Sequence, residues 1–282
     1  MTDVGFSFHC TAVTHIGNRR RNNEDNFFIA NGEFISPDEQ CAMSQQTCRV
    51  IKKSTAFDGA ANRICAVSDG MSGHKDGEIA SHMVVEALAS FSDQYRTKAA
   101  VRQREKFEFV QLFQYMVAQT NADILKLSGD FDPSGMGATL TCVLFFAEEA
   151  VSFNIGDSST FLYEDGSIQK LTVDDNEAEY FRAARDSSID TNGKRLTKYF
   201  GMPRSCGILT ARISLPIPLR PKQIYLIASD GLTDYLRLGD LRDITRMNDR
   251  DPDSVAEQLV ENVLRQEDGG HDNITVVVVK VL

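Results

Sequence analysis

The chain has 282 residues, of which 42% are hydrophobic and 25% are charged, a composition typical of a soluble globular protein with a sizeable core. Its formal net charge of −10 disfavours binding to nucleic acid or to an anionic membrane, because both need a cationic surface. The six cysteines form no Cys-x-x-Cys pair, so we expect neither a zinc ribbon nor a disulfide framework. We see no signal peptide and no long apolar segment, which favours a cytoplasmic location.

Short runs rich in Val, Ile, Phe and Thr predict eight strands. These runs are residues 6–13, 26–29, 64–67, 140–146, 150–155, 160–163, 224–228 and 274–281. The spacing of apolar side chains predicts two long helices, over residues 79–95 and 101–127. Ser254 followed by Glu257 has the pattern of a capping box, which predicts a third helix over residues 255–265.

The order of these elements is strands, two adjacent helices, strands, a helix and a last strand. Because this order is not a βαβ alternation, it favours antiparallel sheets covered by helices, and the lack of a linker or repeat favours one domain over residues 1–282. Residues 33–62 are polar and mixed, and we interpret them as an irregular insertion. The charged residues 173–207 predict a surface flap, and Asp165 with Gly166 predicts a hairpin turn.

Three aspartates lie at the ends of apolar runs. Asp69 ends "ICAVSDG", Asp230 ends "IYLIASDG", and Asp272 precedes "NITVVVV". If adjacent strands brought them together without neutralisation, their pKa values would rise at a cost of several kcal/mol. A hard divalent cation such as Mg²⁺ or Mn²⁺ would remove that cost, because it prefers oxygen ligands. The spacing alone equally allows three separate turn or cap aspartates.

Upstream, the segment "GNRRRNNEDNFFIA" places three arginines shortly before Glu24 and Asp25. One interpretation is a solvated charged turn. The other is an arginine fork for phosphate beside metal-binding carboxylates, since the guanidinium presents planar paired donors. The residues by themselves leave both interpretations open.

Taken together, the motifs resemble the metal-dependent protein phosphatase family, also called protein phosphatase 2C, in its bacterial type. The matching segments are "RRNNEDN", "AVSDGMSGHKDGEIAS", "GMGATLTCVLF", "FNIGDSSTFLY", "LIASDGLTDYL" and "HDNITVVVV". They occur in the family's order from residue 20 to residue 279 and so cover nearly the whole chain. The resemblance implies an α+β fold, an αββα sandwich of two antiparallel β-sheets flanked by helices, with a metal site at one end.

The resemblance also implies which residues hold two Mg²⁺ or Mn²⁺ ions. Asp69 would bridge the two ions, and the carbonyl of Gly70 would be a further ligand. Asp230 and Asp272 would hold one ion, and Glu24 would help to hold the other through water.

Further roles follow from the same resemblance. Arg20 matches the arginine that binds the phosphate of the substrate, while Asp25, Asp157 and Asn273 match residues that support the ligands by hydrogen bonds. The reaction implied is direct attack on phosphorus by a hydroxide that bridges the metals, with no phospho-enzyme.

The chain departs from the family at two informative positions. Many members carry an aspartate that binds a third metal where this chain has Ser134, and Asp132 is the nearest substitute. We therefore expect any third metal site, with Asp132 as its ligand, to be weak or absent. Ser159 stands where an arginine is common.

The function implied is a Ser/Thr protein phosphatase acting on phosphoserine and phosphothreonine. One alternative, favoured by Ser134 and Ser159, is a pseudophosphatase or phosphoprotein-binding module of the same fold with weak or no turnover; another is a non-enzymatic metal-binding domain. Expected partners are phosphorylated proteins, including a Ser/Thr kinase and its substrates, and we expect a monomer. The sequence does not identify the physiological substrate.

Overall fold

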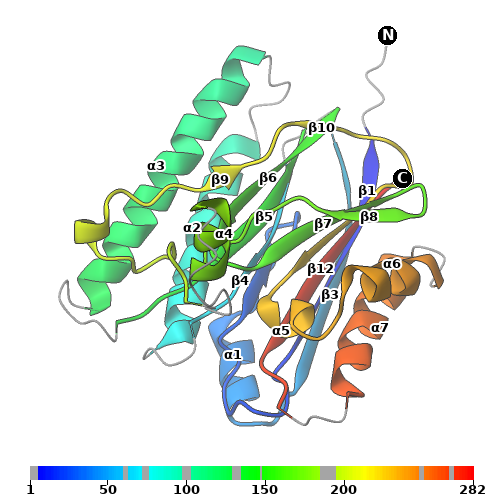
Figure 1. The fold of residues 1–282 in the computed structure, drawn as a ribbon, viewed down its shortest axis with the longest axis horizontal. Helices are drawn as coiled ribbons and strands as arrows, with labels where there is room; N and C mark the ends of the chain where they lie inside the picture. The colour runs from blue at the N-terminus through cyan, green and yellow to red at the C-terminus, as the bar shows by residue number, and fades with distance from the viewer. Residues whose placement is uncertain are drawn as a thin grey trace.

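The computed structural model describes residues 6–59, 63–71, 76–96, 103–128, 135–146, 148–184, 195–247, 251–266 and 270–282. Two β-sheets stack face to face at the centre of the molecule, and helices cover their outer faces (Figure 1). Every strand pairing within these residues is antiparallel. The predicted α+β sandwich of two antiparallel sheets is therefore confirmed.

One sheet, here called sheet A, has the strand order β3-β1-β12-β11-β7-β8. Its strands are β1 (Ser7–His15), β3 (Val50–Asp58), β7 (Ser159–Glu164), β8 (Ser167–Lys170), β11 (Ile224–Ala228) and β12 (Ile274–Val281). The other sheet, sheet B, has the order β10-β6-β5-β4-β2, with β9 also paired to β6. Its strands are β2 (Asn26–Phe28), β4 (Arg63–Ser68), β5 (Leu140–Phe145), β6 (Glu149–Ile155), β9 (Arg212–Ile213) and β10 (Ile217–Pro218).

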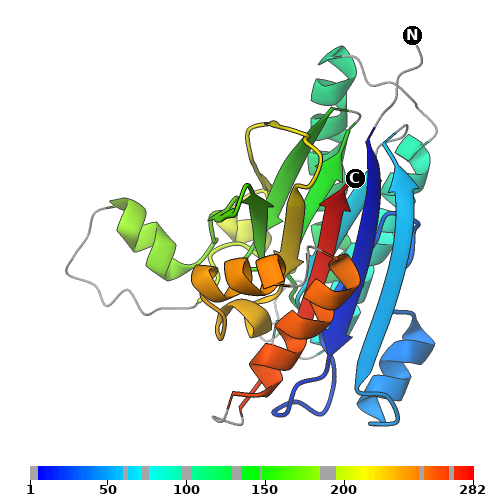
Figure 2. The ribbon, with the colours of Figure 1, turned by 90° about the vertical axis from the view of Figure 1, so that its right-hand side faces the viewer.

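Helices flank the sandwich on both sides (Figure 2). The long helices α2 (Gly77–Arg96) and α3 (Gln103–Ser128) cover sheet B, while α6 (Leu238–Met247) and α7 (Pro252–Leu264) cover sheet A. The shorter helices are α1 (Pro37–Ser44), α4 (Glu177–Ala184), the one-turn α5 (Asp230–Thr233) and the 3₁₀ turn η1 (Arg204–Cys206). No helix in the described part of the chain combines the length and the apolar character needed to cross a membrane.

Strand β12 shows why the sequence "ITVVVV" is apolar without alternation. Val277 and Val279 lie in the core between the two sheets, whereas Val276 and Val278 lie in the core beneath α5, α6 and α7. All four side chains are fully buried. Because both faces of the strand are covered, both sets of alternating positions must be apolar.

The interpretation of residues 33–62 as irregular is wrong for most of the segment. It contains α1, whose N-cap Ser36 forms a capping box with Glu39, and β3, which pairs along the whole of β1. Strand β3 lies at the edge of sheet A and buries mainly Ile51 and Phe57, so its composition is more polar than that of the central strands. The segment is thus part of the sandwich.

Two local predictions have different outcomes. Asp165 and Gly166 do form the turn between β7 and β8, and both have positive φ, 49° and 81°, as a tight hairpin requires. The predicted capping box of the last helix is wrong, because α7 begins at Pro252. Its N-cap is Asp251, whose side chain accepts a hydrogen bond from the backbone N–H of Ser254.

Candidate metal centre

The strand register brings the sequence-predicted carboxylates to one end of the sandwich. In sheet B, Asn26 pairs with Ser68, so Asp25 and Asp69 lie at adjacent strand ends. In sheet A, β11 and β12 are antiparallel neighbours, so Asp230, after β11, and Asp272, before β12, also lie at one end. A hydrogen bond of 2.8 Å from the hydroxyl of Ser229 to Oδ2 of Asp25 joins the two sheets at this place.

Two glycines permit the close approach of these segments. A Cβ atom at Gly231 would lie 1.9 Å from the backbone oxygen of Asn273, so no larger residue fits where α5 begins beside β12. A Cβ atom at Gly70 would lie 2.6 Å from the backbone oxygen of Glu24, which accepts a hydrogen bond of 3.0 Å from the Gly70 N–H. Glycine after each aspartate thus lets the chain segments with carboxylates touch.

Asp69 is at the middle of this group. Desolvation by the surrounding protein and the negative charges of Asp25, Asp230 and Asp157 raise the pKa of Asp69 well above its usual value, and a hydrogen bond with Asp230 raises it further. As a whole residue, Asp69 is half-buried. These neighbouring carboxylates carry the same charge as ionised Asp69, so they disfavour its ionised form.

Asp25 and Asp157 are in a similar state. Burial raises the pKa of Asp25 to about 7, although hydrogen bonds from Thr275 and Ser229 act to lower it. Burial, together with the negative charge of Asp230, raises the pKa of Asp157 to about 7. Carboxylates crowded in this way, with a backbone carbonyl beside them, form the oxygen-rich donor set that a hard divalent cation prefers, so the residues present fit Mg²⁺ or Mn²⁺.

Arg20 and Asp272 form a two-pronged ion pair in this centre. Nε of Arg20 lies 2.6 Å from Oδ1 of Asp272, and Nη2 lies 2.7 Å from Oδ2. Burial acts to raise the pKa of Asp272, but the hydrogen bonds from Arg20 and from the Asn273 N–H, together with the positive charges of Arg20 and Arg19, outweigh it and lower this pKa. The negative charges of Glu24 and Asp69 also raise the pKa of Arg20, so its guanidinium lies within electrostatic range of both carboxylates.

Asn273 connects the segment of Glu24 to the start of β12. Its side-chain Oδ1 accepts a hydrogen bond of 2.8 Å from the Glu24 N–H. Its side-chain amide donates to the carbonyls of Ile16 and Asn22, both at 2.9 Å. Asn273 is therefore placed to hold the loop between β1 and β2 against Asp272.

The ligand atoms of this centre do not converge on a single point. Within the residues that the structure describes, the one group of three His, Cys, Asp or Glu side chains with ligand atoms all within 4.8 Å of one another is His9, Asp251 and Asp253. In that group Asp251 caps α7, and Asp253 pairs with His9 and with Lys52. Ordinary structural contacts therefore account for it, and it contains none of the predicted site residues.

Two hydroxyl side chains that sequence reasoning missed hold the centre together. The Asp69 N–H donates to Oγ1 of Thr139 at 3.0 Å, and the Thr139 N–H donates to the Asp69 carbonyl at 2.8 Å. Ser229 accepts a hydrogen bond of 3.0 Å from the Thr275 N–H while it donates to Asp25. Both lie inside motifs that match the family, but only Ser229 stands next to an acidic residue, Asp230, whereas the motif of Thr139 contains none.

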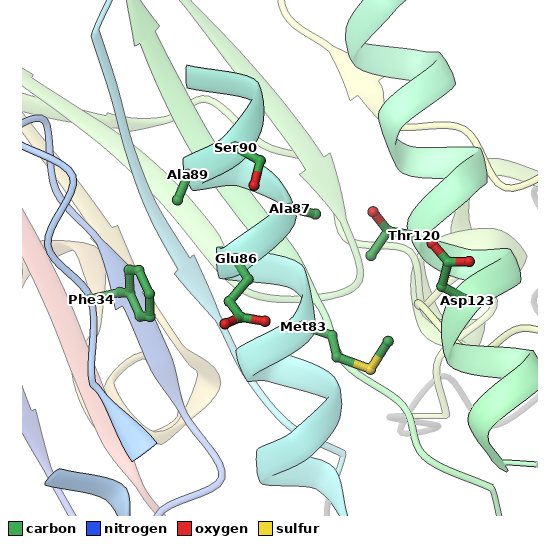
Figure 3. Close-up of a pocket in the computed structure, with 8 residues that line it drawn as sticks. All are labelled: Phe34, Met83, Glu86, Ala87, Ala89, Ser90, Thr120 and Asp123. Atoms are coloured by element: carbon green, nitrogen blue, oxygen red, sulfur yellow. The ribbon is translucent and has the colours of Figure 1, made fainter. Parts of the chain in front are cut away.

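Other predicted positions lie elsewhere. Asp132 and Ser134, on which the expectation about a third metal rests, lie outside the described residues. A separate pocket of about 460 Å³ lies on the surface of α2 and α3 and contains none of the predicted site residues (Figure 3). It is lined by Phe34, Met83, Glu86, Ala87, Ala89, Ser90, Thr120 and Asp123.

The chain has two stacked antiparallel sheets flanked by helices, with acidic side chains gathered at one end, which is the architecture implied by its resemblance to the metal-dependent protein phosphatases. The chain belongs to the protein phosphatase 2C family, whose model matches residues 52–266. The predicted family is thereby confirmed.

The chain is similar to proteins named as Ser/Thr phosphatases. It is 29% identical over 248 residues to the serine/threonine protein phosphatase PstP of Mycobacterium tuberculosis, covering 83% of this chain and 43% of PstP. It is 29% identical over 223 residues to the serine/threonine phosphatase Stp of Listeria welshimeri, covering 77% of this chain and 84% of Stp. The chain thus spans less than half the length of PstP but most of Stp.

Among solved structures, the fold resembles the catalytic domain of PstP in complex with two manganese ions. The TM-score is 0.69 and the identity 24%, with 98% of this chain and 99% of that chain covered. At this identity the likeness concerns the fold.

Proposed function

We propose that this chain is a metal-dependent Ser/Thr protein phosphatase that hydrolyses phosphoserine and phosphothreonine. The observation that carries the proposal is the crowding of carboxylates around Asp69, whose burial and like charges raise its pKa well above the usual value, with the charge of Arg20 acting on the same group. Buried like charges at one end of a sandwich are costly, and a protein retains them where a cation offsets them in function. The names of the relatives agree with the proposal.

The cofactors proposed are two Mg²⁺ or Mn²⁺ ions, as in the solved PstP catalytic domain with manganese. Asp69 would bridge them, with the Gly70 carbonyl as a further ligand. Asp230 and Asp272 would hold one ion and Glu24 the other. When bound, such ions would supply a bridging hydroxide that attacks phosphorus directly.

The chain's own residues would prepare the site for this chemistry. Arg20 would bind two phosphoryl oxygens through its paired N–H groups and offset the charge that grows on them. Asp25, Asp157 and Asn273 would orient the ligands, as Asn273 does for the Glu24 segment through the 2.8 Å hydrogen bond.

The test is hydrolysis of a phosphothreonine peptide by the purified chain after chelation, with and without added Mn²⁺. We expect turnover only with Mn²⁺, and we expect Asp69→Asn to lower it by at least about 100-fold because the substitution removes charge from the bridging ligand. Asp165→Asn is the matched control, since Asp165 lies in the exposed β7–β8 turn and should leave turnover unchanged.

The outcomes separate the alternatives. Substantial activity in Asp69→Asn would mean that the assignment of Asp69 is wrong. A folded wild-type chain that binds Mn²⁺ but does not hydrolyse the peptide would instead be a pseudophosphatase.

The substrates proposed are phosphorylated proteins, including a Ser/Thr kinase and its targets, met by the chain as a monomer in the cytoplasm. We propose that the predicted surface flap, residues 173–207, contacts the substrate and contributes to specificity, because charged loops near a site meet partners first. The described part of this surface includes α4, and Asn176 is bridged to Leu196. Residues 185–194 of the predicted flap lie outside the described residues.

A further inference from the structure

In the Arg20–Asp272 ion pair, the residue predicted to bind phosphate contacts a residue predicted to bind metal. The planar fork of Arg20 uses both Nε and Nη2, and it occupies both carboxylate oxygens of Asp272 at 2.6 and 2.7 Å. Oδ1 of Asp272 also accepts a hydrogen bond of 2.9 Å from the Asn273 N–H. Both oxygens of this ligand are therefore already engaged by the protein.

The pair is accessible enough to open. The Arg20 side chain is 25% exposed and that of Asp272 is 30% exposed, so water can solvate both groups when they separate. Partly exposed ion pairs of this kind have modest net strength, because solvation offsets much of the Coulomb attraction. A divalent ion is a stronger partner for the carboxylate than a guanidinium, and two cations close to one carboxylate repel each other.

Resting on the proposed function, we propose that Arg20 and the divalent metal compete for Asp272, so that metal binding frees Arg20 to bind phosphate. Without metal, the arginine is held on Asp272 and its fork is unavailable to the substrate. With metal on Asp272, the guanidinium would be released near Glu24 and Asp69 and its paired N–H groups would be available to a phosphate. Arg20 would thus order the two binding events, metal before phosphate.

The proposed competition predicts how phosphate and metal change each other's affinity for the chain. Because linkage is reciprocal, a phosphate that draws Arg20 away from Asp272 must strengthen metal binding by the same factor as metal strengthens phosphate binding. Removing the Arg20 side chain should strengthen metal binding in the absence of phosphate and abolish the part of the phosphate effect that passes through Arg20.

The experiment is calorimetric titration of the chelated full chain with Mn²⁺, with and without inorganic phosphate. We expect Arg20→Ala to tighten one Mn²⁺ site by about three- to fivefold, the upper part of the range expected for loss of a partly exposed pair. We expect inorganic phosphate to tighten Mn²⁺ binding in the wild type and to have little effect in Arg20→Ala. Arg20→Lys, which keeps the charge but loses the fork, should fall between the two.

Arg19→Ala is the matched control. Arg19 is exposed, and its charge acts on Asp272, but no hydrogen bond joins the two side chains in the described structure. Its removal takes away the same charge from the same loop and should change Mn²⁺ affinity by less than about twofold.

Several results would overturn the inference. Unchanged or weaker Mn²⁺ binding in Arg20→Ala would show that Arg20 does not compete and instead supports Asp272. Equal effects of Arg19→Ala and Arg20→Ala would reduce the effect to net charge. These results leave the proposed function standing, whereas a wild-type chain that binds no Mn²⁺ would overturn both.

Discussion

In Asp25 and Asp157 of the carboxylate centre, burial disfavours the ionised form of the side chain. Their pKa values of about 7 lie far above the ordinary aspartate value near 4. The metal-free folded chain therefore holds protons that the unfolded chain has already lost. Stability that is present at low pH is lost as the pH rises toward 7, and above pH 7 the full penalty of the two charges applies.

This decrease of stability with rising pH can be measured. We expect the metal-free chain to lose about 1–2 kcal/mol of unfolding free energy between pH 6.5 and pH 8, and we expect saturating Mn²⁺ to remove most of that loss. Urea unfolding of the chelated protein at the two pH values measures it. His15 does not interfere, because burial lowers its pKa to about 4, below this range.

Asp157→Asn provides the control, since it should flatten the pH dependence by roughly half while the protein stays folded. If the metal-free wild type were equally stable, or more stable, at pH 8, the electrostatic description of the centre would be wrong.

At the scale of elements, the contact between α5 and β12 sets the distance between two predicted ligands. Ser229 and Thr275 exchange hydrogen bonds of 3.0 Å, and Gly231 lies against the backbone of Asn273. The start of α5 and the start of β12 therefore form one unit, which carries Asp230 on one side and Asp272 on the other.

A pair of glycine substitutions tests this unit. We expect Gly231→Ala to destabilise the chain by about 2–4 kcal/mol and to weaken Mn²⁺ binding, because its Cβ would displace the Asn273 backbone. Gly239→Ala is the matched control, since a Cβ at Gly239 meets no atom within 4 Å and adds helix propensity in α6. Thermal unfolding and Mn²⁺ titration measure both variants, and similar behaviour of the two would contradict the account.

The elements also show where sequence reasoning succeeds and where it does not. The apolar runs that became β4, β11 and β12 are buried on both faces, so their composition alone predicts strands. Strand β3 is not predicted, because an edge strand that contains Lys52 and Lys53 buries few apolar side chains and lacks an apolar run. Helix α1 carried a readable signal, "SPDE", with a capping Ser36 and a proline in the first turn.

At the scale of the whole molecule, the meeting of distant segments is the part that residues alone leave open. Aspartates at the ends of three apolar runs are equally compatible with three unrelated turns. Their gathering depends on two register relations, Asn26 with Ser68 and Ala228 with Val276, and on the stacking of the sheets that brings Ser229 to Asp25. The order of the motifs predicted the family, whereas the Arg20–Asp272 pair and the role of Thr139 needed coordinates.

We propose that the carboxylates at this end of the sandwich jointly hold two divalent ions. Anomalous diffraction at the manganese edge from crystals grown with Mn²⁺ tests it most directly. We expect two peaks beside Asp69, one of them also beside Asp230 and Asp272. An absence of peaks there, or a peak only at His9, Asp251 and Asp253, would contradict it.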